Sequence, residues 1–299
     1  MGAMNSQYIR SLVSLIISIV IWSGSFVASK IAYQCFSPLV LCAVRFSLAA
    51  LLMTVFRCLN HTHKPLDPSD RRAVMLSALT GVTIYYAFEN IGLSITSAGN
   101  ASVITAVYPV FTILIGYAVF HDRIPSRQLT GILIAVFGIL ILNAGPLDKE
   151  GTKAVFGNLL LILNGFLWGI YNYLTNGITK NTDTASLTYY QCLYGALFFL
   201  PVLLVEPPRL LAPLTMPVVI ALLFLTAGCS MAAYYFYNYG LRTLSVGTTL
   251  AVMNLMPVFG LVFSRIFLGE EIVPRTVIGA IAVIAGVMVS ANARSADTL

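Results

Sequence analysis

The sequence predicts an all-α polytopic membrane protein whose ten transmembrane helices form two inverted five-helix repeats. Three observations carry this prediction: the composition, the number of long apolar stretches, and a similarity between the two halves of the chain. Of the 299 residues, 58% are hydrophobic and 9% are charged, and the mean hydropathy is +0.87. A soluble chain carries about 25% charged residues. So little charge cannot cover a water-exposed surface, and we therefore expect lipid to be the main solvent.

The net charge of +6 does not indicate a nucleic-acid-binding protein, because the basic residues are spread over short loops and form no cluster. Five cysteines are present, an odd number, and none is in a CxxC spacing: Cys35, Cys42, Cys58, Cys192 and Cys229. We therefore expect them to pack as small apolar side chains, with no disulfide framework and no metal site.

Ten apolar stretches are long enough to cross the membrane, for which about 20 helical residues are needed. They cover residues 9–33, 37–58, 72–94, 97–120, 126–144, 154–178, 184–205, 214–241, 245–268 and 273–292. The first stretch lacks a small-residue cleavage site, so we expect it to be a retained span rather than a signal peptide.

The basic residues predict the orientation of the chain. A cytoplasmic N-terminus places ten Lys and Arg at cytoplasmic ends of spans: Arg10, Arg57, Lys64, Arg71, Arg72, Arg123, Arg127, Lys180, Arg242 and Arg294. Five lie at the opposite ends: Lys30, Lys149, Lys153, Arg209 and Arg275. Because cytoplasmic loops carry the excess of basic residues, we expect both termini in the cytoplasm.

The two halves of the chain resemble each other at a shift of 148 residues. Identical residues recur at this spacing, among them Asn90 with Asn238, Pro109 with Pro257, and Gly138 with Gly286. Near the N-terminus the shift is 146 and places Trp22 on Trp168. We therefore divide the chain into repeats over residues 1–147 and 148–299. Each holds five spans, and this odd number makes the second copy enter the membrane in the opposite direction, as is typical of secondary transporters.

The segment ENIGLSITSAGNAS at residues 89–102, followed by PVF at 109–111, resembles the EamA-type drug/metabolite transporter superfamily. The same resemblance is carried by FVASK at 26–30, by Ser37-Pro38 and Arg45-Phe46, and by the GEE turn at 269–271. It covers the whole chain in both halves. The resemblance implies a ten-helix bundle in the bacterial inner membrane that exports small metabolites such as amino acids.

Polar and aromatic side chains recur on one face of spans that the repeat relates in pairs. The two tryptophans lie near the middle of their spans, although tryptophan usually prefers the membrane interface, and this predicts a central cavity. The alternative is simple helix packing. The candidate substrate-binding residues are Trp22, Tyr85, Tyr86, Asn90, Trp168, Tyr171, Asn172, Tyr234, Tyr235, Asn238 and Asn254. Aromatic walls with a few amides suit an organic solute of amino-acid size.

Three charged residues, Lys30, Arg45 and Glu89, lie within spans. A lone charge at the bilayer centre costs about 2.5–3.5 kcal/mol, so we expect Glu89 to pair with Lys30 or Arg45. The pair is either a static lock between helices or a coupling and gating device in which Glu89 carries a proton. Pro109 and Pro257 lie mid-span and each removes a backbone hydrogen bond, so they are either gating hinges or fixed kinks.

The leading functional hypothesis is a secondary transporter that exports amino acids or similar zwitterionic or neutral solutes by alternating access. Phosphorylated or nucleotide-linked sugars are the alternative substrates, and they call for Lys or Arg facing the cavity from both halves. A passive facilitator is a further alternative. We expect a small-molecule substrate and membrane lipid as partners, protons as a candidate coupling ion, no nucleic acid, and a monomer or weak dimer.

An intramembrane enzyme is disfavoured by the residues that such chemistry requires. The histidines His61, His63 and His121 all fall in loops, and no aspartate falls in a span. The sequence has no HExxH, GxGD-like or nucleophile-elbow motif and no phosphate-binding loop of the Walker type. We therefore expect no metal, no cofactor, and no ATP-driven transport by this chain alone.

Overall fold

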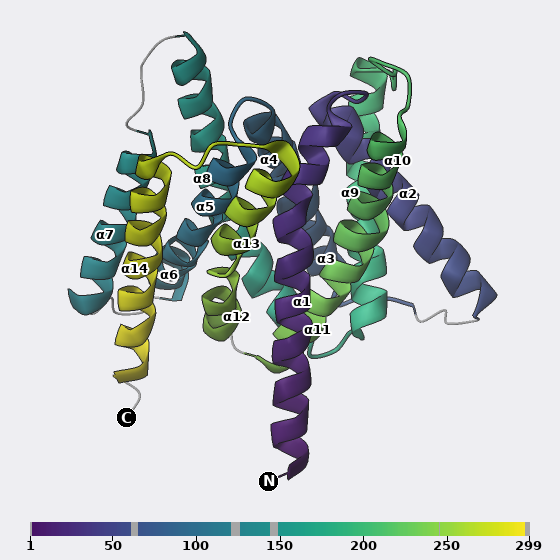
Figure 1. Cartoon of the computed structure of the whole chain (residues 1–299). Helices are drawn as coiled ribbons and strands as arrows, with labels where there is room; N and C mark the ends of the chain where they lie inside the picture. Colours follow the sequence, from purple (N-terminus) through teal and green to yellow (C-terminus); the bar gives the residue numbers. More distant parts are fainter. Residues whose placement is uncertain (1, 61–64, 121–125, 144–148, 245, 297–299) are drawn as a thin grey trace.

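The computed structural model describes residues 2–60, 65–120, 126–143, 149–244 and 246–296. Within these ranges the chain is helical and forms no strand. All ten expected segments are present there as single helices or as runs of shorter ones (Figure 1). The predicted repeat boundary at residues 147/148 lies outside the described residues.

The first half contains α1 (Gly2–Ala32), α2 (Pro38–Leu59), the run α3 (Arg71–Ala78), η1 (Leu79–Ile84) and α4 (Tyr85–Ser94), the run α5 (Ala98–Ile104), η2 (Thr105–Val107) and α6 (Tyr108–Phe120), and α7 (Ser126–Asn143). The second half contains α8 (Lys149–Ile178), α9 (Thr184–Val205), the run α10 (Met216–Leu223), η3 (Phe224–Ala233) and α11 (Tyr234–Thr243), the run α12 (Val246–Met253), α13 (Met256–Phe263) and η4 (Ser264–Leu268), and α14 (Pro274–Ala296). The helices α1 and α8 begin before the apolar stretches that predicted them, at residues 9 and 154, because their first turns include polar residues.

The length and apolar character of the helices fit a membrane protein. Among the described residues, six helical runs are long and apolar enough to cross a membrane, and three shorter apolar helices accompany them. The outer surface carries large apolar side chains such as Phe56 and Leu204, which are 63% and 85% exposed. Helix α1 begins and α14 ends at the same end of the bundle (Figure 1), as an even number of crossings requires.

The helices α7 and α14 lie side by side at one edge of the bundle (Figure 1). Glycines allow this close approach: a Cβ added to Gly138 would lie 2.9 Å from the backbone oxygen of Gly279, and one added to Gly286 would lie 2.6 Å from that of Gly131. Small residues let the backbones of membrane helices approach closely. The 148-residue shift relates Gly138 to Gly286 and Gly131 to Gly279. The same contact therefore occurs twice, with the two helices exchanged.

Two runs of helix contain a π-helical segment at related positions. In the first half η1 precedes the residues Tyr85 and Tyr86, and in the second half η3 precedes Tyr234. A π-helix has an extra residue in its turn and therefore changes which face the following side chains occupy. Both segments thus set the direction in which the polar-aromatic face of the next helix points.

Two other runs are interrupted next to the prolines that the sequence analysis selected. The 3₁₀ turn η2 lies directly before the start of α6, in which Pro109 is the second residue. The gap between α12 and α13 falls at Asn254 and Leu255, directly before Met256 and Pro257. Since proline has no N–H to donate, a break in the helix one turn before it is expected.

The cysteines mostly behave as the sequence predicts. Cys35, Cys42, Cys192 and Cys229 are buried and free, whereas Cys58 is exposed near the end of α2. The expectation that all five pack inside the protein is therefore wrong for Cys58, because α2 turns this residue toward the surface.

Candidate functional site

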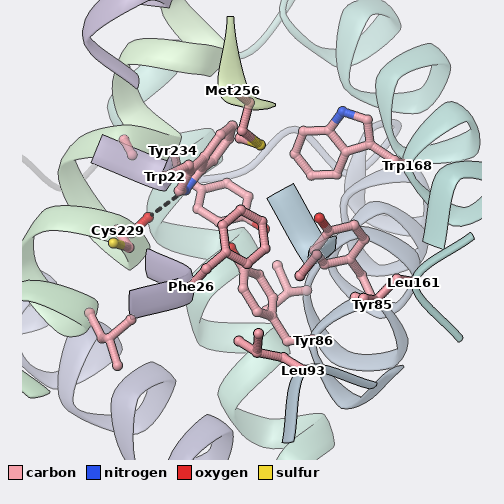
Figure 2. Close-up of a cluster of buried hydrophobic side chains, with 14 of the residues drawn as sticks. Trp22, Phe26, Tyr85, Tyr86, Leu93, Leu161, Trp168, Cys229, Tyr234 and Met256 are labelled. Carbon is pink, nitrogen blue, oxygen red and sulfur yellow. Dashed lines mark hydrogen bonds between the residues drawn. The ribbon is translucent and has the colours of Figure 1, made fainter. Parts of the chain in front are cut away.

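The two tryptophans meet at the centre of the bundle. Trp22 on α1 and Trp168 on α8 pack edge to face, with ring centroids 5.5 Å apart and planes at 84°. The ring of Tyr237 lies 5.0 Å from that of Trp22 and 5.2 Å from that of Trp168. Figure 2 shows Phe26, Tyr85, Tyr86 and Tyr234 around the two indoles. The site is therefore an aromatic cluster to which both halves of the chain contribute.

This cluster surrounds a cavity of about 10 Å³. The cavity is lined by Trp22, Ser25, Phe26, Tyr85, Tyr86, Glu89, Trp168, Met253 and Met256. Such a volume is about what one water molecule needs. The expected central cavity is thus nearly closed in this conformation, in which the alternative of simple helix packing describes the two indoles.

Both indole N–H groups have partners inside the protein. Trp22 Nε1 donates to the backbone oxygen of Cys229 at 3.1 Å, in the π-helical segment η3 (Figure 2). Trp168 Nε1 donates to the Sδ atom of Met253 at 3.2 Å. A buried indole N–H needs such a partner, and these bonds fix the orientation of the rings. They connect α1 and α8 to two helix runs of the second half.

On the side of the second half, a network of amides and hydroxyls supports the cluster. Tyr171 stacks on Trp168 with centroids 4.7 Å apart, and its hydroxyl donates to Asn238 Oδ1 at 2.9 Å. Asn238 Nδ2 in turn donates to Gln191 Oε1 at 2.9 Å. Tyr237 donates to Asn172 Oδ1 at 2.7 Å. Because buried polar groups must be paired in lipid, this network holds α8, α9 and α11 together.

Glycine at residue 81 lets the ring of Tyr171 reach this position. A Cβ atom at Gly81 would overlap the ring of Tyr171. The backbone oxygen of Gly81 accepts a hydrogen bond of 2.7 Å from the hydroxyl of Tyr234. The π-helical segment η1 therefore touches aromatic residues from two helices of the second half.

On the side of the first half, Asn90 and two tyrosine hydroxyls are also paired. Asn90 Oδ1 accepts from the hydroxyl of Tyr33 at 2.9 Å, and Asn90 Nδ2 donates to the backbone oxygen of Tyr86 at 2.9 Å. The hydroxyls of Tyr85 and Tyr108 lie 3.3 Å apart.

Arg45, another buried polar residue of this half, keeps two side-chain nitrogen atoms unpaired. It is fully buried, and its Nε atom donates to Ser230 Oγ at 3.0 Å. Its Cζ atom lies 4.6 Å from the ring centroid of Tyr86 and 5.0 Å from that of Phe46. The atoms Nη1 and Nη2 have no hydrogen-bond partner.

Glu89 is 4% exposed and lines the small cavity. The opposite charge that acts on its carboxylate is that of Arg45. Lys30, by contrast, is half-buried and interacts electrostatically with Glu270. The expected pairing of Glu89 is therefore not found: the end of α1 carries Lys30 toward the turn before α14, and among the described residues Glu89 forms no ion pair with Arg45 either.

Glu270 lies in that turn and joins the two halves. Its Oε1 atom accepts from the backbone N–H of Ala98 at 2.8 Å, and its Oε2 atom accepts from that of Gly99 at 2.9 Å. A carboxylate at the N-terminus of a helix is stabilised by free N–H groups and by the helix dipole. The GEE turn of the sequence thus supplies a cap for α5, a role that no local pattern reveals.

Two of the predicted site residues, Tyr235 and Asn254, belong neither to the aromatic cluster nor to the amide network that supports it. Tyr235 is 39% exposed and faces an outer groove with Phe236, away from the indoles. Asn254 lies at the break between α12 and α13, where its buried Oδ1 atom has no partner, and it does not line the cavity. Its neighbours Met253 and Met256 take that position.

The structure also adds residues that the predicted site omits. Ser25, Phe26, Met253 and Met256 line the cavity, and Gln191 belongs to the amide network. A usable signal existed for Gln191, because the 146-residue shift places it on Arg45. The methionines carried no signal, since an apolar residue in a span is ordinary.

Comparison with known proteins gives consistent results. The sequence profile of the EamA-like transporter family matches residues 9–144 and again residues 155–292. A protein from Archaeoglobus fulgidus described as an uncharacterized transporter is 31% identical over 91% of this chain and 94% of its own.

Two further relatives have more specific descriptions. A probable terminal-alkyne amino-acid exporter from Streptantibioticus cattleyicolor is 24% identical over 92% of this chain and 91% of its own. A probable amino-acid metabolite efflux pump from Salmonella typhimurium is 25% identical over 91% of both chains. A solved crystal structure with 17% identity superposes with a TM-score of 0.68 over 94% of this chain and 97% of its own, which shows a shared fold.

Proposed function

Because the chain belongs to the EamA-like transporter family, we propose that it exports amino acids or similar zwitterionic or neutral solutes across the inner membrane by alternating access. Family membership makes it a membrane transporter of small molecules. The class of solute, the direction of transport and the mechanism are the proposal.

The observation that carries the proposal is the closed aromatic cluster between the halves. Trp22 and Trp168 occupy positions that the repeat relates, and their contact closes the centre of the bundle. A movement that separates α1 from α8 would open a space walled by aromatic rings and bordered by amides. Such a site suits an organic solute with an apolar side chain. Two of the similar proteins are described as an amino-acid exporter and an amino-acid metabolite efflux pump, which favours the same class.

Related structural devices in the two halves support alternating access. The π-helical segments η1 and η3, the helix breaks before Pro109 and Pro257, and the reciprocal α7–α14 contact all recur at the shift of 148 residues. If the halves are inverted, exchange of their conformations moves access from one side of the membrane to the other. In this proposal, the two breaks are hinges about which α6 and α13 move relative to the helices that precede them.

The charges of the described spans favour a zwitterionic or neutral solute over a sugar phosphate. Arg45 lies beside the cluster in the first half, and its counterpart in the second half is the uncharged Gln191. A phosphorylated solute calls for cations on both sides of the site. Glu89, next to the cavity, would repel a phosphate further.

The experiment that tests the proposal is counterflow in proteoliposomes. Proteoliposomes that contain the purified full chain are loaded with one unlabelled amino acid at a time. Uptake of the same amino acid in labelled form is then followed with and without a pH gradient. Saturable counterflow is expected for apolar amino acids and not for sugar phosphates. Flux that does not saturate and shows no counterflow identifies a passive channel and contradicts the proposal.

Proton coupling through Glu89 is tested in the same assay. We expect Glu89→Gln to abolish the stimulation by the pH gradient and to leave counterflow measurable, because exchange moves no net proton. Stimulation equal to that of the unmodified protein would show that Glu89 carries no coupling proton.

The inverted arrangement with cytoplasmic termini is tested by labelling. Single cysteines replace the exposed residues Ser69 and Glu271 in a Cys58→Ser background, since the other four native cysteines are buried. An impermeant thiol reagent added outside cells is expected to label residue 271 and not residue 69. Labelling of both from one side contradicts the arrangement.

A further inference from the structure

Arg45 keeps the N–H groups of two side-chain nitrogen atoms without a partner in the interior of the protein. The residue is 0% exposed, and Nη1 and Nη2 have no partner. An unpaired buried donor is costly, and more so on a charged group. The nearby aromatic rings of Tyr86 and Phe46 attract the cation but accept no strong hydrogen bond. The site therefore contains a guanidinium whose forked end has no protein ligand.

The counterpart of Arg45 in the second half shows that this is not a property of the position. Gln191 uses its side chain fully: Nε2 donates to Ser77 Oγ at 3.1 Å and Thr175 Oγ1 at 3.2 Å, and Oε1 accepts from Asn238 Nδ2 at 2.9 Å. An amide at this level of the bundle is thus satisfied by the protein itself. The first half holds a charged group instead and leaves its donors free.

The guanidinium lies next to the central cavity. Tyr86 lines the cavity, and the face of its ring carries Arg45 at 4.6 Å. Glu89 lines the same cavity and is the carboxylate on which the charge of Arg45 acts. Among the described residues the two charges form no contact within ion-pair distance, so each retains capacity for another ion. The site offers one positive and one negative group at adjacent positions.

We propose that Arg45 and Glu89 together recognise the zwitterionic head group of an amino acid. The paired Nη1 and Nη2 atoms bind the carboxylate in the bidentate manner that a guanidinium favours, and Glu89 accepts hydrogen bonds from the ammonium group. The inference rests on the proposed function and adds to it the groups that select the substrate. In the closed conformation Tyr86 covers the guanidinium, so the head group binds when the Tyr86 side chain turns away.

The two charges also explain which solutes are rejected. A pure anion meets Glu89, and a pure cation meets Arg45, so each loses one favourable contact and gains a repulsive one. Specificity of this kind depends on the repulsive element as much as on the attractive one. The aromatic walls contact the side chain of the solute and discriminate less.

The test compares three probes that share one side chain: L-phenylalanine, phenethylamine, which lacks the carboxylate, and 3-phenylpropionate, which lacks the ammonium group. Binding to the purified full chain is followed by its tryptophan fluorescence, because the only two tryptophans are Trp22 and Trp168. The unmodified protein is expected to bind L-phenylalanine more tightly than either analogue. Arg45→Gln is expected to weaken L-phenylalanine binding about 10- to 100-fold, as loss of hydrogen bonds to a charged group predicts, and to leave phenethylamine binding unchanged or stronger.

Glu89→Gln is expected to give the reverse pattern, with weaker binding of L-phenylalanine and unchanged or stronger binding of 3-phenylpropionate. Arg57→Gln is the matched control, since Arg57 lies in the same helix about 18 Å further along and is buried against Ser186, Tyr189 and Tyr190. This variant should retain the preference for L-phenylalanine.

Gln191 shows that an amide fits the equivalent position, so Arg45→Gln is expected to fold, as its unfolding temperature in detergent will show. Arg45→Lys is a second test variant. It keeps the positive charge but loses the bidentate hydrogen bonding of the guanidinium, and it should weaken L-phenylalanine binding less than Arg45→Gln does. If the unmodified protein shows amino-acid counterflow while Arg45→Gln and Arg45→Lys bind all three probes as it does, the head-group inference is overturned and the proposed function stands. If the unmodified protein neither binds L-phenylalanine nor shows counterflow of any amino acid, both fail.

Discussion

The indole of Trp22 meets the indole of Trp168 edge to face at 5.5 Å, and these two residues occupy related positions in the two halves of the chain. The contact leaves a cavity of only about 10 Å³. Closure therefore depends on helices α1 and α8 from opposite halves, and any opening movement must separate the two rings or rotate them.

Separation of the indoles should be visible in their fluorescence. Both tryptophans of the chain lie in this contact, so no other indole contributes to the signal. We expect a solute that opens the cluster to shift the emission to longer wavelength, because water reaches the rings. Trp22→Phe and Trp168→Phe assign the shift to one ring. An emission spectrum that stays constant while counterflow proceeds would show that the rings do not separate.

Removal of one indole should impair both stability and transport. Trp168→Ala deletes the contacts with Trp22 and Tyr171 and the hydrogen bond to Met253. Large aromatic to alanine changes in a core cost about 3–5 kcal/mol. We expect a lower unfolding temperature and strongly reduced counterflow. Tyr235→Ala, which changes a tyrosine outside the cluster, is the control that should transport normally.

Gly81 should tolerate no side chain. In Gly81→Ala the new methyl group would overlap the ring of Tyr171, so the ring must leave its stack on Trp168. Overpacking of this kind costs about 1–3 kcal/mol, and we expect lower counterflow together with a lower unfolding temperature. At Gly177 an added Cβ meets nothing within 4 Å. Gly177→Ala should therefore be neutral or slightly stabilising, and equal effects of the two changes would contradict the packing argument.

The cap that Glu270 places on α5 should control one end of the transport pathway. Glu270→Ala removes both hydrogen bonds to the N–H groups of Ala98 and Gly99, a loss of about 1 kcal/mol. We expect the contact between α5 and the turn before α14 to open more often. A cysteine introduced at Asn100 should then react faster with an impermeant thiol reagent. Glu271→Ala removes a neighbouring exposed carboxylate and should leave the rate unchanged.

The helix break before Pro257 should affect the rate of transport more than stability. In Pro257→Ala the helix can regain a backbone hydrogen bond, which straightens the break at Asn254 and Leu255. We expect slower counterflow with an unfolding temperature that is equal or higher. Pro201 lies inside α9 and has no counterpart at a break in the first half, so Pro201→Ala is the control. An unchanged rate in Pro257→Ala would mean that the break is a fixed kink.

The sequence alone determined the number and order of the helices. A span must be long and apolar enough to cross the hydrocarbon core, and both properties are local to the stretch of sequence. The sequence also determined that Trp22 and Trp168 are related, and that Tyr86, Asn90 and Asn238 belong to polar-aromatic helix faces. Both follow from the similarity between the two halves of the sequence. The positions of Pro109 and Pro257 likewise located the two helix breaks.

Only the tertiary structure decided which of these residues meet. Tyr234 points into the cluster and Tyr235 away from it, because successive residues of a helix face different directions and the π-helical segment η3 changes the register in a way that a regular period does not predict. The cap of α5 by Glu270, the satisfied amide of Gln191 and the free donors of Arg45 depend on contacts between helices far apart in the chain. Which hydrogen bonds form inside the helix bundle depends on the partners that packing brings within reach. No single stretch of sequence contains that information.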